Sequence, residues 1–143
     1  MKKFSSAFTM IELVFVIVVL GILAGIAVPR LAATRDDATI AKMRGDIAAI
    51  RSGISLKRSE NLMKGDVSWP DLNKTAGNTV LFDNVLQQPI YPGTARNGWS
   101  RNGATNTVFT ARVANDETDF TYNQANGTFD CDHSESLCQK LAE

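Results

Sequence analysis

One carboxylate lies in a stretch that otherwise has the composition of a membrane-spanning helix. Glu12 is followed by sixteen residues without a charge, Leu13 to Val28. As a helix, Phe8 to Val28 would extend about 31 Å at 1.5 Å per residue, close to the ~30 Å hydrocarbon core of a bilayer. An ionised side chain there costs about 2.5–3.5 kcal/mol, so it normally has a cationic partner. No Lys or Arg lies between Phe4 and Pro29, so we expect that partner to come from another chain, from a newly made amino terminus, or from both.

The residues before and after Glu12 form a motif. Lys2 and Lys3 precede a small residue, Ala7, and residues 8–13 read Phe-Thr-Met-Ile-Glu-Leu. This arrangement resembles the amino terminus of the type IV filament superfamily, the type IV pilins and the pseudopilins of type II secretion. The resemblance implies a leader of residues 1–7, cleavage between Ala7 and Phe8 by a prepilin peptidase, and N-methylation of Phe8. The family prefers Gly directly before the cleavage site, whereas this chain has Ala7. Cleavage by the peptidase is the step that this difference affects.

The charge chemistry of the motif suggests a role in assembly. Cleavage before Phe8 would create an α-amino group with a pKa of about 7.7–8.0, which is largely cationic at neutral pH. Glu12 could bond to the terminus of its own helix or to that of a neighbouring subunit, and a misplaced subunit would leave both charges unpaired. The resemblance also implies a helix-kinking role for Pro29. We therefore expect Phe8, Glu12 and Pro29 to act in assembly.

The chain after the apolar segment, residues 8–29, should form a single head domain, residues 30–143. Apolar side chains recur there at spacings of three and four, which is typical of one helix face: Ile40, Met43, Ile47, Ile50 and Ile54. The helix should therefore continue from the membrane segment to about Arg58. From Asn61 to Gly103 the sequence predicts mostly loop, with a short helical turn over Leu81 to Gln87.

Three strands are predicted near the carboxyl terminus. Thr107 to Val113 alternates Phe109, Ala111 and Val113 with polar or smaller residues. After a turn at Asn115-Asp116, Asp119 to Tyr122 and Gly127 to Cys131 are the next two strands. The predicted fold is α+β: a long N-terminal helix, membrane-spanning in its first half and amphipathic in its second, packed on a small antiparallel sheet.

Two cysteines, Cys131 and Cys138, close a short loop. In an exported head they would lie in an oxidising compartment, which favours a disulfide, and the resemblance implies such a C-terminal loop. A zinc site is the alternative, with Cys131, His133, Cys138 and one carboxylate as ligands. A weaker candidate is calcium, held by Asp130, Asp132 and Glu135, although their order is not that of an EF-hand. We expect no other cofactor or metal.

Charge is divided unevenly along a chain whose net charge is zero. Residues 30–58 carry seven basic and three acidic side chains, whereas residues 59–143 carry six basic and eleven acidic ones. A basic helix and an acidic head are compatible with attraction between subunits, although a solvated helix face has the same composition. The global balance gives no support for a nucleic-acid or membrane-surface role.

The sequence therefore predicts a structural subunit and no enzyme. His133 is the one histidine of the chain, and no catalytic triad or glycine-rich phosphate loop is present. The resemblance implies four partners: the prepilin peptidase and methylase, an inner-membrane platform protein, an assembly ATPase, and other pilin or pseudopilin subunits. It also implies a single-pass protein of the bacterial inner membrane, with a cytoplasmic amino terminus and a periplasmic head that later enters a filament.

Other readings stay open at this point. A secretory signal peptide cut near Ala32-Ala33 leaves Glu12 unexplained. An exported binding protein with an uncleaved membrane anchor fits the length of the apolar segment. A DNA-uptake pilin would need a stacking surface for single-stranded DNA. Its candidate residues are Trp69, Tyr91, Trp99 and Tyr122 with Arg96 and Arg101. We expect these aromatics to form the core and rim of the head instead.

Overall fold

The computed structural model describes residues 8–74, 79–103 and 106–142. Its elements, in chain order, are α1 (Met10–Met63), β1 (Asn97–Arg101), β2 (Val108–Val113), β3 (Asp116–Asn123), β4 (Thr128–Cys131) and α2 (Ser136–Ala142). The chain divides into two compact units, the first ending at Arg35 and the second covering Asp36–Glu143. The predicted α+β class is confirmed.

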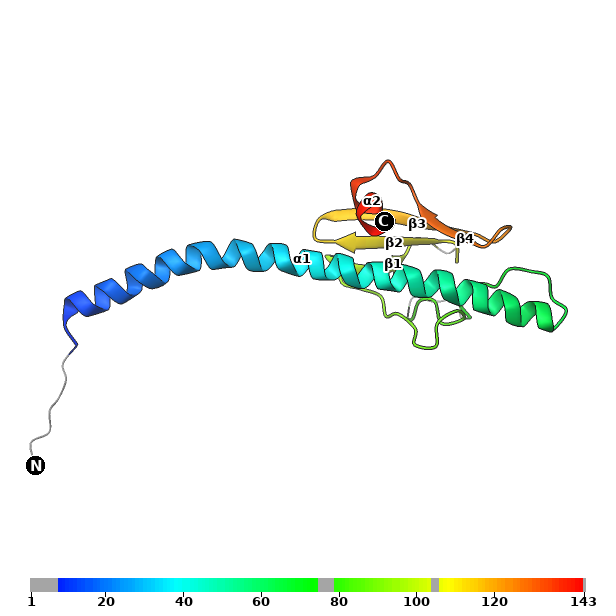
Figure 1. Ribbon diagram of the computed structural model, residues 1–143, viewed down its shortest axis with the longest axis horizontal. Helices are drawn as coiled ribbons and strands as arrows, with labels where there is room; N and C mark the ends of the chain where they lie inside the picture. The colour runs from blue at the N-terminus through cyan, green and yellow to red at the C-terminus, as the bar shows by residue number, and fades with distance from the viewer. Residues whose placement is uncertain (1–7, 75–78, 104–105, 143) are drawn as a thin grey trace, which may run out of the picture. The chain divides into compact units, whose positions relative to one another are not determined.

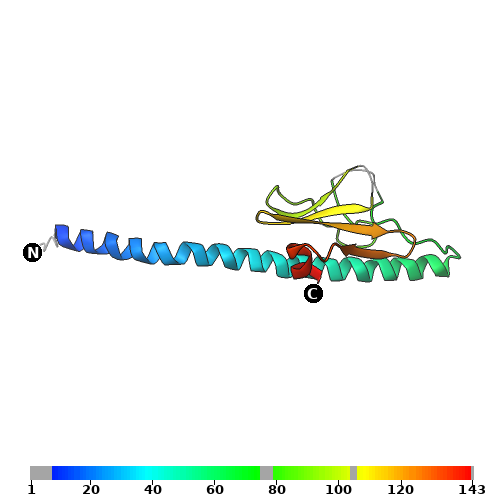
Figure 2. The same ribbon diagram turned by 90° about the horizontal axis from the view of Figure 1, so that it is seen from above.

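The second unit has two layers, the later part of α1 and an antiparallel sheet (Figure 1 and Figure 2). One apolar stripe of α1 is buried, and it is the stripe that the spacing predicts: Met43, Ile47, Ile50 and Ile54. Ile40, at its start, is partly buried against the same core. Burial of each such side chain stabilises the fold by roughly 1.5–3 kcal/mol, so this stripe provides much of the attachment of the sheet to α1.

α1 ends at Met63, five residues beyond the predicted Arg58. The stop is a Schellman motif, in which Gly65 has a φ of 84°. The Asp66 amide donates to the Asn61 carbonyl at 2.9 Å, and the Gly65 amide donates to the Leu62 carbonyl at 3.0 Å. Before the stop, Glu60 pairs with Lys57 and Lys64 on the same helix face, and these hydrogen bonds lower the pKa of Glu60 to about 2.

The sheet has the order β1-β2-β3-β4, with every neighbouring pair antiparallel. β2, β3 and β4 correspond to the three predicted strands, and Phe109, Ala111 and Val113 face the core as the alternation predicts. The β2–β3 turn is at Ala114 and Asn115, one residue earlier than predicted, because Val113 pairs with Asp116. β1 was not predicted: part of the expected loop pairs with β2.

Five aromatic rings fill the space beneath the sheet. Their centroids lie 4.4–6.2 Å from one another in the pairs that touch, a spacing at which aromatic pairs attract. The five are Phe82, Trp99, Phe109, Phe120 and Phe129. The Trp99 indole Nε1 donates to Asp46 Oδ2 of α1 at 3.1 Å. Partial burial raises the pKa of the Asp46 carboxyl. The hydrogen bond from Trp99 lowers this pKa by a smaller amount.

The described residues between α1 and β1, 64–74 and 79–96, form turns and one bridge within the second unit. The helical turn predicted over Leu81 to Gln87 is present as a single turn, enclosed by a bridge between Leu81 and Ile90. Within that turn, the Leu86 amide donates to the Phe82 carbonyl at 2.9 Å. Earlier in the segment, the Tyr122 hydroxyl donates to the Pro70 carbonyl at 2.8 Å. The turn lies close to α1, because a Cβ on Gly53 would overlap the carbonyl oxygen of Val85.

Two glycines of α1 provide a matched test of this close approach. We expect Gly53→Ala to lower the free energy of unfolding of the second unit by about 1–3 kcal/mol, because the turn must move away from α1. Gly45 has open space around its Cβ position, so Gly45→Ala should raise that free energy by about 0.4–1 kcal/mol. Urea denaturation followed by tryptophan fluorescence measures both. Effects of the same sign would contradict the packing described here.

Candidate functional site

Met10–Val28 is an apolar helical segment of the first unit, and its side chains are exposed. By length and composition it is the one helix stretch among the described residues that could cross a membrane. None of it is buried inside the protein. Glu12 is the one charged residue within it. Such a surface is stable only when lipid or other apolar helices cover it.

The start of α1 is a capping box built by Thr9 and Glu12. The Glu12 amide donates to Thr9 Oγ1 at 3.3 Å, and the Thr9 amide donates to Glu12 Oε2 at 3.2 Å. The Thr9 hydroxyl also donates to Glu12 Oε2, at 3.1 Å. These reciprocal bonds satisfy amides that the first turn of a helix leaves free. A carboxylate in the first turn is further favoured by the helix dipole.

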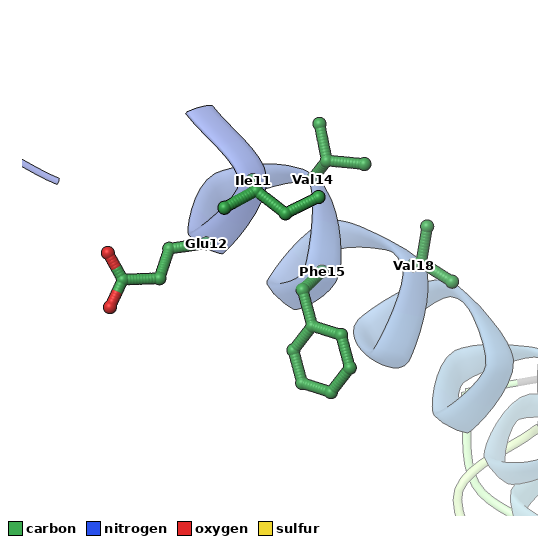
Figure 3. Close-up of a pocket in the computed structure, with 5 residues that line it drawn as sticks. All are labelled: Ile11, Glu12, Val14, Phe15 and Val18. Atoms are coloured by element: carbon green, nitrogen blue, oxygen red, sulfur yellow. The ribbon is translucent and has the colours of Figure 1, made fainter. Parts of the chain in front are cut away.

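The two carboxylate oxygens of Glu12 differ in their surroundings. Oε2 accepts both Thr9 hydrogen bonds, whereas among the described residues no hydrogen bond to Oε1 is found. Figure 3 shows the carboxylate projecting from the helix beside a hollow lined by apolar side chains. The lining side chains follow one helix face: Ile11, Val14, Phe15 and Val18. One oxygen of Glu12 thus serves the helix start, and the other is available to a further donor.

Of the other residues predicted to act in processing and assembly, the structure describes Phe8 and Pro29. Phe8 is exposed and immediately precedes the capping box. Ala7 and the leader lie outside the described residues. Pro29 lies within α1, and the helix continues through it; the kink expected there stays a prediction. The Thr9 contribution was not predicted, although Thr-x-x-Glu before an apolar run is a recognisable capping signal.

Cys131 and Cys138 form a disulfide, with Cα atoms 5.8 Å apart. Both cysteines are buried. The predicted pairing is therefore confirmed. The zinc alternative is wrong, because the two thiolates that it required are joined to each other.

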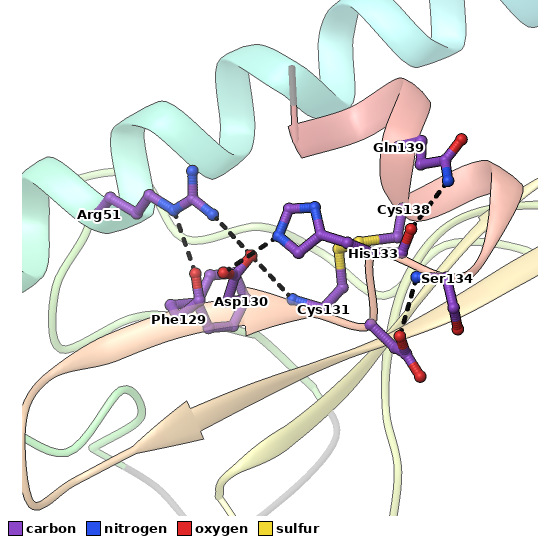
Figure 4. The surroundings of a disulfide bond; sticks show 9 residues. Arg51, Phe129, Asp130, Cys131, His133, Ser134, Cys138 and Gln139 are labelled. Atoms are coloured by element: carbon purple, nitrogen blue, oxygen red, sulfur yellow. Dashed lines mark hydrogen bonds and ion pairs between the residues drawn. A yellow bond between two sulfur atoms is a disulfide. The ribbon is translucent and has the colours of Figure 1, made fainter.

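α1 holds the segment around the disulfide through two arginines, of which Figure 4 shows Arg51 beside β4. Arg51 Nε donates to the Phe129 carbonyl at 3.1 Å, and its Nη2 lies 3.2 Å from Asp130 Oδ1. Arg44 Nε donates to the Lys140 carbonyl at 2.6 Å, at the end of α2. The backbone carbonyls of β4 and α2 thus gain charged donors from the same helix.

Two of the three predicted calcium ligands, Asp130 and Asp132, are engaged in local contacts. Asp130 contacts Arg51 and, through its other oxygen, His133 Nε2 at 3.3 Å. Asp132 Oδ1 accepts from the Ser134 amide at 2.9 Å, and this bond lowers the pKa of Asp132. Within the described ranges, no three His, Cys, Asp or Glu side chains converge closely enough to share a metal ion. Calcium binding at Asp130, Asp132 and Glu135 stays a prediction.

The aromatic surface needed for a DNA-uptake role is not assembled. Trp99 and Tyr122 are buried, so their rings cannot stack on bases. Trp69 is partly buried and lies under the Arg58 guanidinium, 4.9 Å from its ring centroid. Tyr91 is the one exposed aromatic of the predicted set. The aromatics thus pack the head, as expected, and the stacking platform of the alternative interpretation is not formed.

The comparisons with known proteins agree with the geometry of the amino-terminal segment. The family described as "Prokaryotic N-terminal methylation motif" matches residues 2–28. The chain is 37% identical over 60 residues to type II secretion system core protein G of Pseudomonas aeruginosa, covering 42% of each protein. It is 31% identical over 77 residues to type IV major fimbrial protein FimA of Dichelobacter nodosus, covering 54% of this chain and 46% of that one.

A third relative is core protein G of Klebsiella michiganensis, 39% identical over 60 residues and again covered over 42% of its length. The chain thus spans less than half the length of these curated relatives. No solved structure matches it. The motif and the relatives support one class of protein, the superfamily of type IV pilins and type II secretion pseudopilins.

The disulfide should stabilise the second unit. Closing a loop with a sequence separation of 7 is worth about 2.5 kcal/mol in the chain-entropy account. We expect the Cys131→Ala, Cys138→Ala double variant to lower the free energy of unfolding by an amount of that order in urea denaturation. Wild type in the presence of a reductant is the matched control and should behave similarly. An unchanged midpoint in both would contradict a stabilising role.

Proposed function

We propose that this protein is a structural subunit of a type IV filament system, either a pseudopilin of type II secretion or a type IV pilin. The observation that carries the proposal is the exposed apolar helix Met10–Val28 with Glu12 as its single charge. The methylation motif over residues 2–28 and the relatives from both systems support it. Before assembly, this helix anchors the subunit in the membrane. When the subunit enters the filament, neighbouring helices replace the lipid around the apolar helix.

The role of Glu12 follows from its two oxygens. Oε2 belongs to the capping box with Thr9, so the carboxylate is partly satisfied while the subunit is alone in the membrane. Oε1 then receives the Phe8 α-amino group of a neighbouring subunit, and that contact selects the axial position. A subunit at another height leaves an amine and a carboxylate unpaired among apolar helices, which is costly.

The proposed subunit acts with other proteins of the assembly system and is divided between two compartments. The prepilin peptidase and methylase act on Ala7 and Phe8, and an inner-membrane platform protein with its ATPase drives assembly with other subunits. The amino terminus faces the cytoplasm, where Lys2 and Lys3 favour retention. The head lies in the periplasm, an oxidising compartment that suits the Cys131–Cys138 disulfide. The protein itself has a structural role and no enzymatic one.

Processing gives the first test. We expect intact-mass spectrometry of protein from native membranes to find a mature chain beginning at Phe8 with a methylated amine. Ala7→Gly should accelerate cleavage and Ala7→Leu should block it, because the peptidase pocket is expected to accept a small side chain. Chains beginning only at Met1, in cells with an active prepilin peptidase, would contradict the proposal and favour an uncleaved anchor.

Glu12 variants separate its two roles. Gln at this position keeps a capping acceptor for Thr9 but removes the charge, whereas Val removes both. If the charge pair sets the axial position, Glu12→Gln and Glu12→Val should both insert into the membrane normally and both fail to assemble. The measurements are membrane abundance, cleavage, and subunit in sheared filaments or, for a pseudopilus, secretion into the medium.

The same comparison identifies the competing explanations. Normal assembly of Glu12→Gln with failure of Glu12→Val would assign the effect to the helix cap. Wild-type assembly of both, with reduced methylation, would restrict Glu12 to recognition by the peptidase and methylase. Either outcome would overturn the charge-pair account.

A further inference from the structure

Three Asn-Gly pairs occur in the head, and this dipeptide has a chemistry of its own. They are Asn97-Gly98, Asn102-Gly103 and Asn126-Gly127. The glycine backbone nitrogen can attack the Asn side-chain carbon Cγ, forming a five-membered succinimide and releasing the amide nitrogen as ammonia. Water then opens the ring to aspartate or isoaspartate. The step requires a free glycine amide and backbone freedom to bring it against Cγ, so the folded structure decides which pair reacts.

Hydrogen bonds hold both residues of the Asn126-Gly127 pair in place. The Gly127 amide donates to the Asn123 carbonyl at 2.7 Å, so its nitrogen is already engaged. Asn126 Oδ1 accepts from both the amide and the hydroxyl of Thr128, at 3.1 and 2.8 Å. The Trp69 ring lies against Gly127, where it would overlap any added Cβ. Neither the attacking nitrogen nor the target carbon can rearrange without breaking these contacts.

The Asn97-Gly98 pair is held by the sheet. Both residues belong to β1, where Asn97 is paired with Val113 and Gly98 with Arg112. Asn97 Oδ1 accepts from the Ala114 amide at 2.9 Å. Gly98 is crowded as well, because an added Cβ would lie 2.7 Å from the Cα of Gly93. Ring closure here would require β1 to leave the sheet.

The Asn102-Gly103 pair is restrained less: the Asn102 amide donates to the Val108 carbonyl at 3.0 Å, but this bond leaves the Gly103 nitrogen and Asn102 Cγ unengaged. It follows the last residue of β1, and both residues are exposed. Gly103 has a φ of 79° and open space around its Cβ position, and no hydrogen bond from its amide to another described residue is found. Among the described residues, the Asn102 side chain makes one hydrogen bond, in which Nδ2 donates to Asp119 Oδ2 at 3.2 Å. Its Cγ and Oδ1 stay accessible.

We propose that Asn102 is a site of spontaneous covalent modification, where the Gly103 nitrogen closes a succinimide on Asn102 and hydrolysis leaves an acidic residue. The reaction consumes one water and releases one ammonia, and it needs no other reactant. Its product faces Asp119 with a second carboxylate, so a hydrogen bond becomes a like-charge contact between the end of β1 and β3. The modification therefore adds a negative charge to the head and weakens the local structure, independently of whether the subunit enters a filament.

The experiment uses the three pairs as internal controls within one molecule. The full chain, purified in detergent, is incubated at mildly alkaline pH, digested, and mapped by mass spectrometry for the mass change of amide-to-acid conversion. In folded protein we expect conversion at Asn102 to exceed that at Asn97 and Asn126 several-fold. In urea-unfolded protein the three rates should converge, because the restraints on the other two pairs are lost. Asn102→Gln should abolish conversion at this position, because attack of the Gly103 nitrogen on the longer glutamine side chain would have to close a larger ring.

Two results would overturn the proposal. Conversion at Asn97 or Asn126 as fast as at Asn102 in folded protein would show that the local restraints do not govern the reaction. An Asn102 side chain that is stable when folded but reactive when unfolded would show that the Asp119 contact protects it. An Asn102→Asp variant with an unchanged thermal midpoint would refute the destabilising consequence.

Discussion

The second unit depends on the contact between one stripe of α1 and the inner face of the sheet. Met43, Ile47, Ile50 and Ile54 meet the aromatic cluster beneath the strands, and both sides of this contact are buried. Neither layer would be stable alone, because a small sheet and a single helix face each leave an apolar surface in water. The head domain therefore cannot fold without the later part of the helix that, at its other end, carries the apolar segment.

α1 also organises the parts of the head that follow the sheet. A seven-residue helix such as α2 is too short to be stable by itself. Three kinds of interaction fix it: the disulfide, the burial of Leu137 and Leu141, and the Arg44 bond to its last turn. Arg51 supplies the corresponding donor for β4. Because the two arginines are seven residues apart on α1, they lie on one helix face and act along the same side of the head.

The parts of the fold that the sequence predicted are those with strong periodicity. The isoleucine stripe and the alternation in β2 each depend on side chains of one kind repeated at the spacing of one structure. β1 has a single buried side chain, Trp99, among Asn, Gly, Ser and Arg, so its pairing with β2 makes it a strand where local composition indicates a loop. The helix end at Gly65 and the spacing of Leu137 and Leu141 were local signals that could have been recognised. The burial of Trp99 and Tyr122 agrees with the expectation that these aromatics form the core of the head, whereas their individual partners could not be predicted, because an aromatic residue carries no local signal of which residues it will contact.

The candidate site at the start of α1 shows why a charge persists in an apolar segment. A threonine at the cap alone would satisfy one amide of the first turn, and an uncharged glutamine would complete the capping box as well as glutamate does. The capping box therefore does not require the negative charge, although the helix dipole favours it, and carrying it into an apolar environment has a cost. Under the proposed function, a Phe8 α-amino group supplies the cationic partner. An amine from a neighbouring subunit would arrive only when the apolar surface of the helix is also being covered, so the charge pair and the burial of that surface would form together.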